Sequence, residues 1–147
     1  MLHQNIRVTA DAVVFRHDDQ LLKILLVKRK FDPFKGMWAF PGGFVEDNEE
    51  LETAAIRELK EETGLELSEM EQLGAFGKVG RDPRGRTVSA VYYAFVDEDA
   101  GEVAGGDDAA EARWMSVNDI KELAFDHMEI LKHAQQQLGN RMSLLIS

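Results

Sequence analysis

The feature that most constrains this chain is a glycine turn at Gly43 that leads into a helix with three glutamates near its far end. Gly64 is a natural residue just past the last helical turn, because glycine readily adopts the left-handed backbone that ends many helices. Asp47 or Asn48 is expected to cap the start of the helix. Its apolar stripe consists of Leu51, Ala54, Ala55 and Leu59. The fold must therefore bury one face of this helix.

The three glutamates are arranged in a way that helix stability alone would not favour. On a helix, Glu58, Glu61 and Glu62 fall within one arc of about 100°. Glu58 forms like-charge pairs at i,i+3 and i,i+4, and each costs roughly 0.2–0.5 kcal/mol on an isolated helix. Their position at the negative end of the helix dipole disfavours each carboxylate by about 0.3–1 kcal/mol. A divalent cation would reverse both penalties, since carboxylates are hard oxygen ligands for Mg²⁺ or Mn²⁺.

A solvated acidic helix face is the alternative interpretation of these glutamates. The same arc of the helix contains Leu51, Ala54 and Ala55, with Leu59 at its edge. The carboxylates therefore border the packing side of the helix and do not occupy its polar back. This placement favours a cation site over a solvated face.

The stretch from Gly43 to Leu65 resembles the Nudix box, GX5EX7REUXEEXGU with U aliphatic. Every fixed position is matched, by Gly43, Glu49, Arg57, Glu58, Leu59, Glu61, Glu62, Gly64 and Leu65. The resemblance covers nearly the whole chain. It implies one Nudix domain over residues 1–147, with the box at 43–65 and a mixed central sheet between the box helix and a C-terminal helix. It also implies Mg²⁺-dependent hydrolysis of a nucleoside diphosphate linked to a further group.

The resemblance implies a role for each matched residue. Glu58, Glu61 and Glu62 would be ligands of Mg²⁺ or Mn²⁺, and Gly43 would contribute its carbonyl oxygen. Arg57 would orient a box glutamate, and its i,i+4 spacing from Glu61 suits that pairing. Glu61 is also a candidate for the general base.

The remaining sequence predicts an α+β fold. β-branched and alternating apolar residues predict strands over 6–15, 21–29 and 87–96. The spacing of apolar residues over 127–138 predicts a second amphipathic helix. Strands and helices in this order are typical of a mixed sheet flanked by helices, an α/β/α sandwich. The length of 147 residues and a hydrophobic fraction of 44% indicate one globular domain.

Two loops carry candidate substrate-binding residues. Phe34 and Trp38 could stack on a nucleobase, and core packing is the alternative. The sequence Asp82-Pro83-Arg84-Gly85 fits a type I turn. Around it lie Arg81, Arg84 and Arg86, whose forked donors suit phosphate and ribose oxygens. A solvated hairpin turn, or a dimer interface, is the alternative for these arginines.

An acidic, glycine-rich loop over 97–111 offers further carboxylates. In Nudix hydrolases that act on ADP-ribose, a carboxylate on a loop after the central strand often acts as the base. The resemblance therefore makes Asp107, Asp108 and Glu111 candidates for that role, and solvation is the alternative for each.

Segments outside the box suggest the substrate. Residues 80–89 are similar to a stretch found in ADP-ribose pyrophosphatases. Residues 123–127 are similar to a stretch in the same enzymes and in Nudix-related regulators of NAD metabolism. We therefore expect hydrolysis of ADP-ribose to AMP and ribose 5-phosphate. The alternatives are another Nudix substrate, such as an oxidised dNTP or a dinucleoside polyphosphate, or a protein that senses ADP-ribose without cleaving it.

The composition of the chain limits the classes of partner that it is expected to bind. A formal net charge of −10 disfavours a nucleic-acid backbone as the main partner. The chain has no cysteine, which excludes disulfides and thiolate metal sites and suits a cytoplasmic location. Its apolar runs are too short to predict a membrane span. The expected partner is a small nucleotide, and analogy with the family suggests a homodimer.

Overall fold

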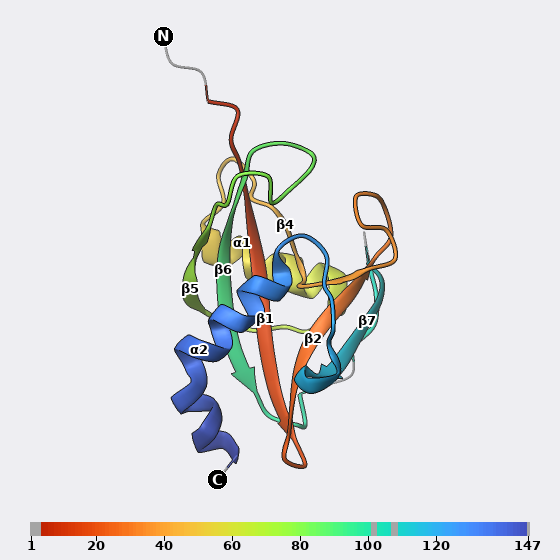
Figure 1. Cartoon of the computed structure of the whole chain (residues 1–147), viewed down its shortest axis with the longest axis vertical. Coiled ribbons are helices and arrows are strands. Elements are labelled where there is room, and N and C mark those ends of the chain that lie inside the picture. The colour runs from red at the N-terminus through yellow and green to blue at the C-terminus, as the bar shows by residue number, and fades with distance from the viewer. Residues whose placement is uncertain (1–3, 101–102, 107–108, 147) are drawn as a thin grey trace.

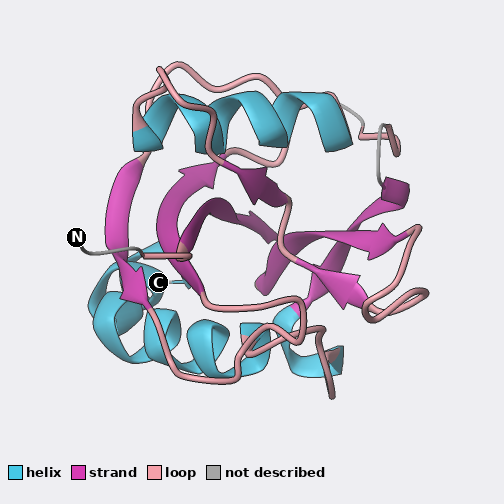
Figure 2. Cartoon of the chain, turned by 90° about the horizontal axis from the view of Figure 1, so that it is seen from above, coloured by secondary structure: helices cyan, strands magenta, loops and turns pink. Residues whose placement is uncertain are grey.

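A mixed sheet lies between two helices (Figures 1 and 2). This computed structural model describes residues 4–100, 103–106 and 109–146, with side chains up to residue 139. The strands are β1 Arg7–Asp18, β2 Leu21–Arg29, β3 Trp38–Ala39, β4 Gly42–Phe44, β5 Glu71–Phe76, β6 Thr87–Val96 and β7 Ala109–Ser116. The helices are α1 Leu51–Thr63, the short 3-10 turn η1 Val117–Asp119 and α2 His127–Ile146. The predicted α+β sandwich is confirmed.

The sheet has the strand order β3-β2-β1-β6-β5, with β4 added on β1 and β7 added on β2. β1 and β6 run parallel over 7–16 of β1, and the other described pairs are antiparallel. β1 pairs with β2 only where Phe15–Asp18 faces Leu21–Ile24. Beyond Ile24, β2 continues beside β7, while the first half of β1 pairs with β4. The first half of β1 and the second half of β2 therefore separate.

Side chains along β1 alternate between the two faces of the sheet and pack into a hydrophobic core on each face. Val13 and Phe15 pack on the α2 side, in a cluster that includes Ile130 and Leu131. Ala10, Ala12 and Val14 pack on the α1 side with Ala54, Ala55 and Leu59. Small residues on both sides of this second interface allow α1 to lie close to the sheet, which brings the end of the helix to the edge of β4.

The ends of α1 partly match the prediction. Gly64 has φ 81°, and its N–H donates to the carbonyl of Lys60 at 2.8 Å, so the predicted glycine termination is confirmed. The expected cap by Asp47 or Asn48 is wrong, because the capping position is Glu50, whose side chain makes no cap hydrogen bond. Residues 47 and 48 form a turn that is closed by the N–H of Glu49 on the carbonyl of Glu46 at 3.2 Å.

The second helix is longer than its predicted range of 127–138, since α2 continues to Ile146. Within the described part of the chain, neither helix has the length and apolarity needed to cross a membrane.

Candidate active site

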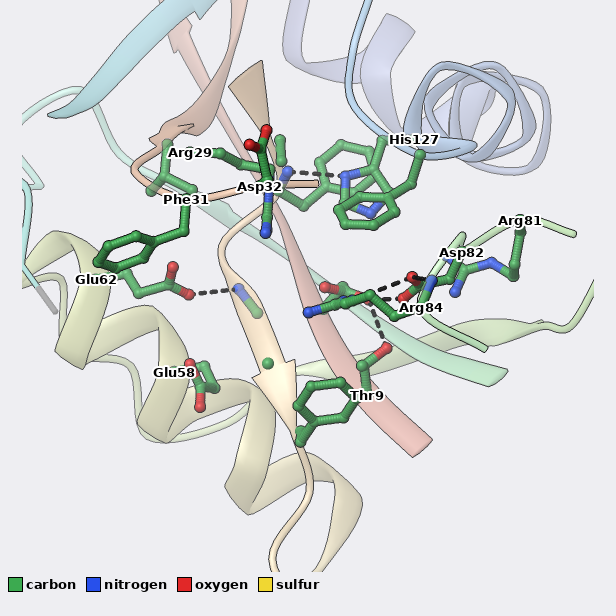
Figure 3. Close-up of a pocket in the computed structure, with 18 of the residues that line it drawn as sticks. Thr9, Arg29, Phe31, Asp32, Glu58, Glu62, Arg81, Asp82, Arg84 and His127 are labelled. Atoms are coloured by element: carbon green, nitrogen blue, oxygen red, sulfur yellow. Dashed lines mark hydrogen bonds and ion pairs between the residues drawn. The ribbon is translucent and has the colours of Figure 1, made fainter. Parts of the chain in front are cut away.

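A cavity of about 360 Å³ opens where β1 and β2 separate (Figure 3). Its floor comes from Thr9 and Asp11 of β1 and from Val27 and Arg29 of β2. One wall is β4 with the end of α1, and the opposite wall is the loop 81–84 with the turn before α2. The volume lies in the range of small-molecule sites. The separation of two strands that pair elsewhere therefore produces the site.

Glu58 and Glu62 form the acidic wall of this cavity (Figure 3). Glu62 is only 6% exposed, and its Oε1 accepts a hydrogen bond from the Gly42 N–H at 2.8 Å. Glu58 lies directly against Gly43, where an added Cβ would be 2.7 Å from the Glu58 carboxylate. Glycine is therefore needed at both positions 42 and 43, because a side chain there would keep the backbone from lying against the Glu58 and Glu62 carboxylates.

Arg57 also lines the cavity and ties the box glutamates together. Its Nε and Nη2 donate to the two oxygens of Glu49 at 2.5 and 2.9 Å. Its Nη1 donates to Glu58 Oε1 at 2.8 Å and to Glu61 Oε2 at 3.2 Å. The hydrogen bonds from Arg57 hold the pKa of the Glu49 carboxyl below its usual value. The predicted pairing with Glu61 is present, and Glu58 is held more closely.

The electrostatics of the acidic wall are unfavourable when no cation is bound. Burial raises the pKa of Glu58. Burial also raises the pKa of Glu62 to about 9, against the hydrogen bond from Gly42, and the charges of Glu58 and Asp11 add to the rise. Among the described residues, no lysine or arginine forms an ion pair with Glu62. Arg57 pairs with Glu58, so among the described residues it is the buried Glu62 that lacks a basic partner.

This donor set fits a hard divalent cation. Glu58, Glu62 and the carbonyl of Gly43 offer oxygen ligands, and the nearby Glu61 is paired with Arg57 and has 41% of its side chain exposed. Within the described residues, no group of three or more acidic or histidine side chains is already arranged as a metal site. Binding would therefore draw the glutamates inward, which their flexible side chains permit.

Adding saturating Mg²⁺ to protein treated with EDTA is expected to raise the melting temperature by roughly 5–10 °C. A ligand at 100 times its dissociation constant stabilises the folded state by about 2.7 kcal/mol, and relief of carboxylate repulsion is the physical source here. Differential scanning fluorimetry measures the shift, with Na⁺ at matched ionic strength as the control. The absence of a specific shift with both Mg²⁺ and Mn²⁺ would contradict the cation site.

Sequence reasoning missed a polar cluster in the floor of the cavity. Asp11 is buried, and its Oδ2 accepts hydrogen bonds from Thr9 Oγ1 at 3.2 Å and from Ser89 Oγ. These residues come from β1 and from β6, which is parallel to it. The one available signal was a single Asp inside an apolar strand pattern, which is unusual at a core position.

His127 was also missed as a cavity residue. It is buried, and its Nδ1 accepts a hydrogen bond from the Phe40 N–H at 3.1 Å. Its ring stacks on Phe40 with centroids 4.5 Å apart. Burial lowers the pKa of His127. The imidazole is therefore neutral and acts as an acceptor that holds the turn before β4.

The neutral His127 predicts a pH dependence of stability. The unfolded chain takes up the proton first as the pH falls, so the free energy of unfolding should drop by up to about 1.4 kcal/mol between pH 7.5 and 5.5. Urea denaturation at pH 7.5 and 5.5 measures this for the wild type and for His127→Asn, which keeps an acceptor near Nδ1. The raised pKa values of Glu58 and Glu62 make stability change with pH in the opposite direction, and they do so in both proteins. The difference in pH dependence between wild type and His127→Asn therefore reports on His127 alone. An unchanged slope in the variant would refute this assignment.

The three predicted arginines have different environments. Arg84 lines the cavity and is the one that reaches into it from the wall opposite the glutamates (Figure 3). Arg81 also lines the cavity, but its buried side chain is committed to Asp126 through bonds of 2.7 and 3.0 Å. Arg86 is exposed and is not among the described lining residues. The turn itself is confirmed by the Gly85 N–H on the Asp82 carbonyl at 3.3 Å.

The aromatic residues of the cavity differ from those that the sequence suggested. Phe34 packs edge-on against Phe125 at 4.8 Å, and Trp38 packs on the α2-side core with Arg113 over its ring. Neither is among the described lining residues, because Trp38 packs on the core and Phe34 packs against Phe125. The lining aromatics are Phe31, Phe40, Phe44 and Phe125. Phe31 is 56% exposed, and its ring is therefore available for contact with a ligand.

The candidate bases on the acidic loop gain no support from the cavity. Glu111 lies on β7, where it pairs with Arg113 at 2.7 Å, and it is not among the described lining residues. Asp107 and Asp108 lie outside the described residues. Glu61 is not among the described lining residues either, but its Oε2 accepts a hydrogen bond from Arg57, which does line the cavity.

Comparison with known families decides the classification of this site. The model of the NUDIX domain matches residues 5–134. The chain belongs to the Nudix family. The matched range includes every residue of the acidic wall and the cavity floor, so the resemblance read from the box is confirmed.

Curated relatives within the family include an ADP-ribose pyrophosphatase of Methanocaldococcus jannaschii, 50% identical over 110 residues. That match covers 75% of this chain and 64% of the relative. The ADPR responsive transcriptional repressor NtrR of Acinetobacter baylyi is 35% identical over 138 residues, with 91% of this chain and 55% of the relative covered. This Nudix chain therefore spans less than two thirds of the length of either relative.

A solved structure shows the same fold around a nucleotide. The NUDIX domain of Shewanella oneidensis NrtR, complexed with ADP ribose, superimposes with a TM-score of 0.85 at 34% identity. The match covers 92% of this chain and 90% of that chain. The shared fold therefore extends over most of this chain.

Proposed function

We propose that this Nudix domain hydrolyses ADP-ribose to AMP and ribose 5-phosphate with the aid of Mg²⁺ or Mn²⁺. The observation that carries the proposal is the two-sided cavity, in which Glu58 and Glu62 face Arg84 across a space of small-molecule size. A diphosphate bridge suits such a space, because one side can hold a cation and the other offers fixed N–H donors. The 50% identity to an ADP-ribose pyrophosphatase supports this choice among diphosphates.

In this proposal different residues bind the cation and orient its ligands. Glu58, Glu62 and the Gly43 carbonyl would hold the cation, and Arg57 orients Glu58 and Glu61 through its hydrogen bonds. When bound, the cation would neutralise charge on the phosphates and lower the pKa of the attacking water. The water attacks one phosphorus, the bridging P–O bond breaks, and the leaving phosphate carries away the bridging oxygen.

Two further groups complete the proposed reaction. Glu61 accepts the proton of the attacking water, because Arg57 holds its Oε2 and 41% of the Glu61 side chain is exposed. Phe31 offers an exposed ring at the cavity on which the adenine can stack. We propose Phe31 for this role in place of Phe34 and Trp38, whose rings are packed elsewhere.

The second candidate function is a sensor that binds ADP-ribose without cleaving it. Its support is the identity to the repressor NtrR and the likeness to the NrtR domain bound to ADP ribose. These relatives leave the absence of a nucleic-acid partner as a prediction. The homodimer, the cytoplasmic location and the single domain over 1–147 also stay predictions.

A panel of nucleotides at saturating Mg²⁺ tests the choice of substrate. We expect kcat/KM for ADP-ribose to exceed that for an oxidised dNTP and for a dinucleoside polyphosphate by at least about tenfold, the effect of one well-placed group. Higher kcat/KM for another nucleotide would overturn ADP-ribose while retaining the hydrolase. Tight binding of ADP-ribose without turnover of any compound would favour the sensor.

A further inference from the structure

The loop opposite the box glutamates presents Arg84 in a fixed orientation. We propose that Asp82 is a positioning residue that holds the Arg84 guanidinium so that its free edge binds a phosphate oxygen of the diphosphate. This inference rests on the proposed function, and it explains how the chain fixes the substrate relative to Glu58 and Glu62. The argument depends on three sets of contacts around the guanidinium.

The Asp82 carboxylate binds both the backbone and the side chain of Arg84. The Asp82 carboxylate accepts hydrogen bonds from the Arg84 backbone N–H at 2.9 Å, from Nε at 3.1 Å and from Nη2 at 2.8 Å. The Asp82 side chain is only 2% exposed, whereas that of Arg84 is 34% exposed. Burial alone would raise the pKa of Asp82, but its bonds to Arg84 outweigh burial and lower it. The buried carboxylate is therefore ionised and serves as an anchor.

Aromatic rings restrict the plane of the same guanidinium. The Arg84 Cζ lies 5.0 Å from the ring centre of Phe44 and 5.5 Å from that of Phe125. Phe44 comes from β4 and Phe125 from the turn before α2, so the rings reach Arg84 from two different walls of the cavity. The carboxylate fixes one edge of the guanidinium, and the rings limit its rotation.

The loop as a whole is tied down at both ends. Arg81 forms its buried ion pair with Asp126, the residue just before α2. On the other side, Arg7 Nη2 donates to the carbonyl of Arg84 at 3.3 Å. The loop that carries Asp82 and Arg84 is therefore joined to α2 and to β1, the two elements that also shape the cavity.

The donors that remain on Arg84 are suited to one task. A guanidinium has five N–H groups, and Asp82 takes those at Nε and one at Nη2. The others lie on the edge that points into the cavity toward the acidic wall (Figure 3). Because Asp82 offsets its charge, Arg84 acts chiefly through directed hydrogen bonds. It should select a phosphate by position, and Lys should not replace it.

The chain contains a matched control for this pair. Arg16 Nε and Nη2 donate to Asp18, also two residues away, at 2.9 and 2.7 Å. The Arg16 Cζ lies 4.3 Å from the ring centre of Trp114. This second pair has the same chemistry and is not among the described residues that line the cavity. Variants of it report what breaking such a pair does to stability alone.

The test compares Asp82→Asn, Arg84→Lys and the double variant with Asp18→Asn and Arg16→Lys. We expect Asp82→Asn and Arg84→Lys each to raise KM for ADP-ribose about tenfold or more, with a smaller fall in kcat. The KM of the double variant should not exceed that of Arg84→Lys, because Asp82 acts through Arg84. The Mg²⁺-induced rise in melting temperature should remain in all of them. Inhibition by AMP and by ribose 5-phosphate identifies the phosphate concerned, since only one product should lose affinity.

Two results would overturn the proposal. One is KM and kcat within about twofold of the wild type in both Asp82→Asn and Arg84→Lys, with the proteins folded. The other is an equal rise in KM in the Asp18 and Arg16 variants, which would make the effect structural. If the wild type fails to turn over ADP-ribose, the proposed function fails, and the same comparison is made with the best substrate of the panel, which shares the diphosphate.

Discussion

Glu62→Gln is expected to lower kcat by at least about 10²-fold, the scale of removing one preorganised electrostatic group from a site. Gln keeps the oxygen that accepts the Gly42 N–H, so the fold has no reason to change. The variant loses the charge that would hold the cation, and with it the ordering of the diphosphate. Steady-state kinetics of ADP-ribose hydrolysis at saturating Mg²⁺ measure the loss.

The same variant should be more stable than the wild type in EDTA. Burial beside Glu58 and Asp11 raises the pKa of Glu62 to about 9, so folding at neutral pH requires this carboxyl to take up a proton or to bury its charge. Gln carries neither cost. We expect a gain of about 1–2 kcal/mol, or a few °C in melting temperature. Glu66→Gln, on an exposed glutamate paired with Lys60, is the control and should change neither quantity. A fall in both stability and activity would make Glu62 a purely structural residue.

Gly42→Ala and Gly43→Ala are expected to fail in different ways. A Cβ at Gly42 would lie 2.0 Å from Asp11 Oδ1 and 2.6 Å from the backbone oxygen of Ala10. Because a paired strand backbone cannot give way, Gly42→Ala should lose about 3 kcal/mol or more of unfolding free energy. The three atoms nearest to a Cβ at Gly43 all belong to the flexible carboxylate end of Glu58. Gly43→Ala should therefore fold but displace a ligand, with kcat lowered by about 10²-fold.

Urea denaturation and kinetics separate the two glycine variants. Gly139→Ala is the control, because nothing lies within 4 Å of the added Cβ and alanine favours a helix by about 0.5–1 kcal/mol over glycine. Equal losses of stability in Gly42→Ala and Gly43→Ala, with unchanged kcat in the second, would show that the Glu58 contact has no part in catalysis.

The parts of the fold that could be predicted depend on local sequence. The box helix follows from the spacing of Ala54, Ala55 and Leu59 and from the glycine at its end. The pairing of Arg57 with Glu61 follows from helical spacing alone. Alternation likewise identified β2 and β6. Periodicity and helix termination act within a few residues, so one sequence suffices to predict them.

The remaining parts of the site depend on contacts between distant segments. Asp11 meets Ser89 because β1 runs parallel to β6, and no local pattern encodes that register. Which of Phe31, Phe34 and Trp38 is available to a ligand depends on tertiary packing. Trp38 packs on the core and Phe34 packs against Phe125. The role of Asp82 depends on the way in which its loop is tied to α2. In each case long-range packing decides, and the sequence supplies only the residue types.

The measurement that tests the central claim most directly is incubation of the chain with ADP-ribose and Mg²⁺, with quantification of both products by chromatography. We predict equal amounts of AMP and ribose 5-phosphate, no product in EDTA, and little product from Glu62→Gln. Binding of ADP-ribose with no product from the wild type at any Mg²⁺ or Mn²⁺ concentration would contradict the hydrolase and leave a sensor.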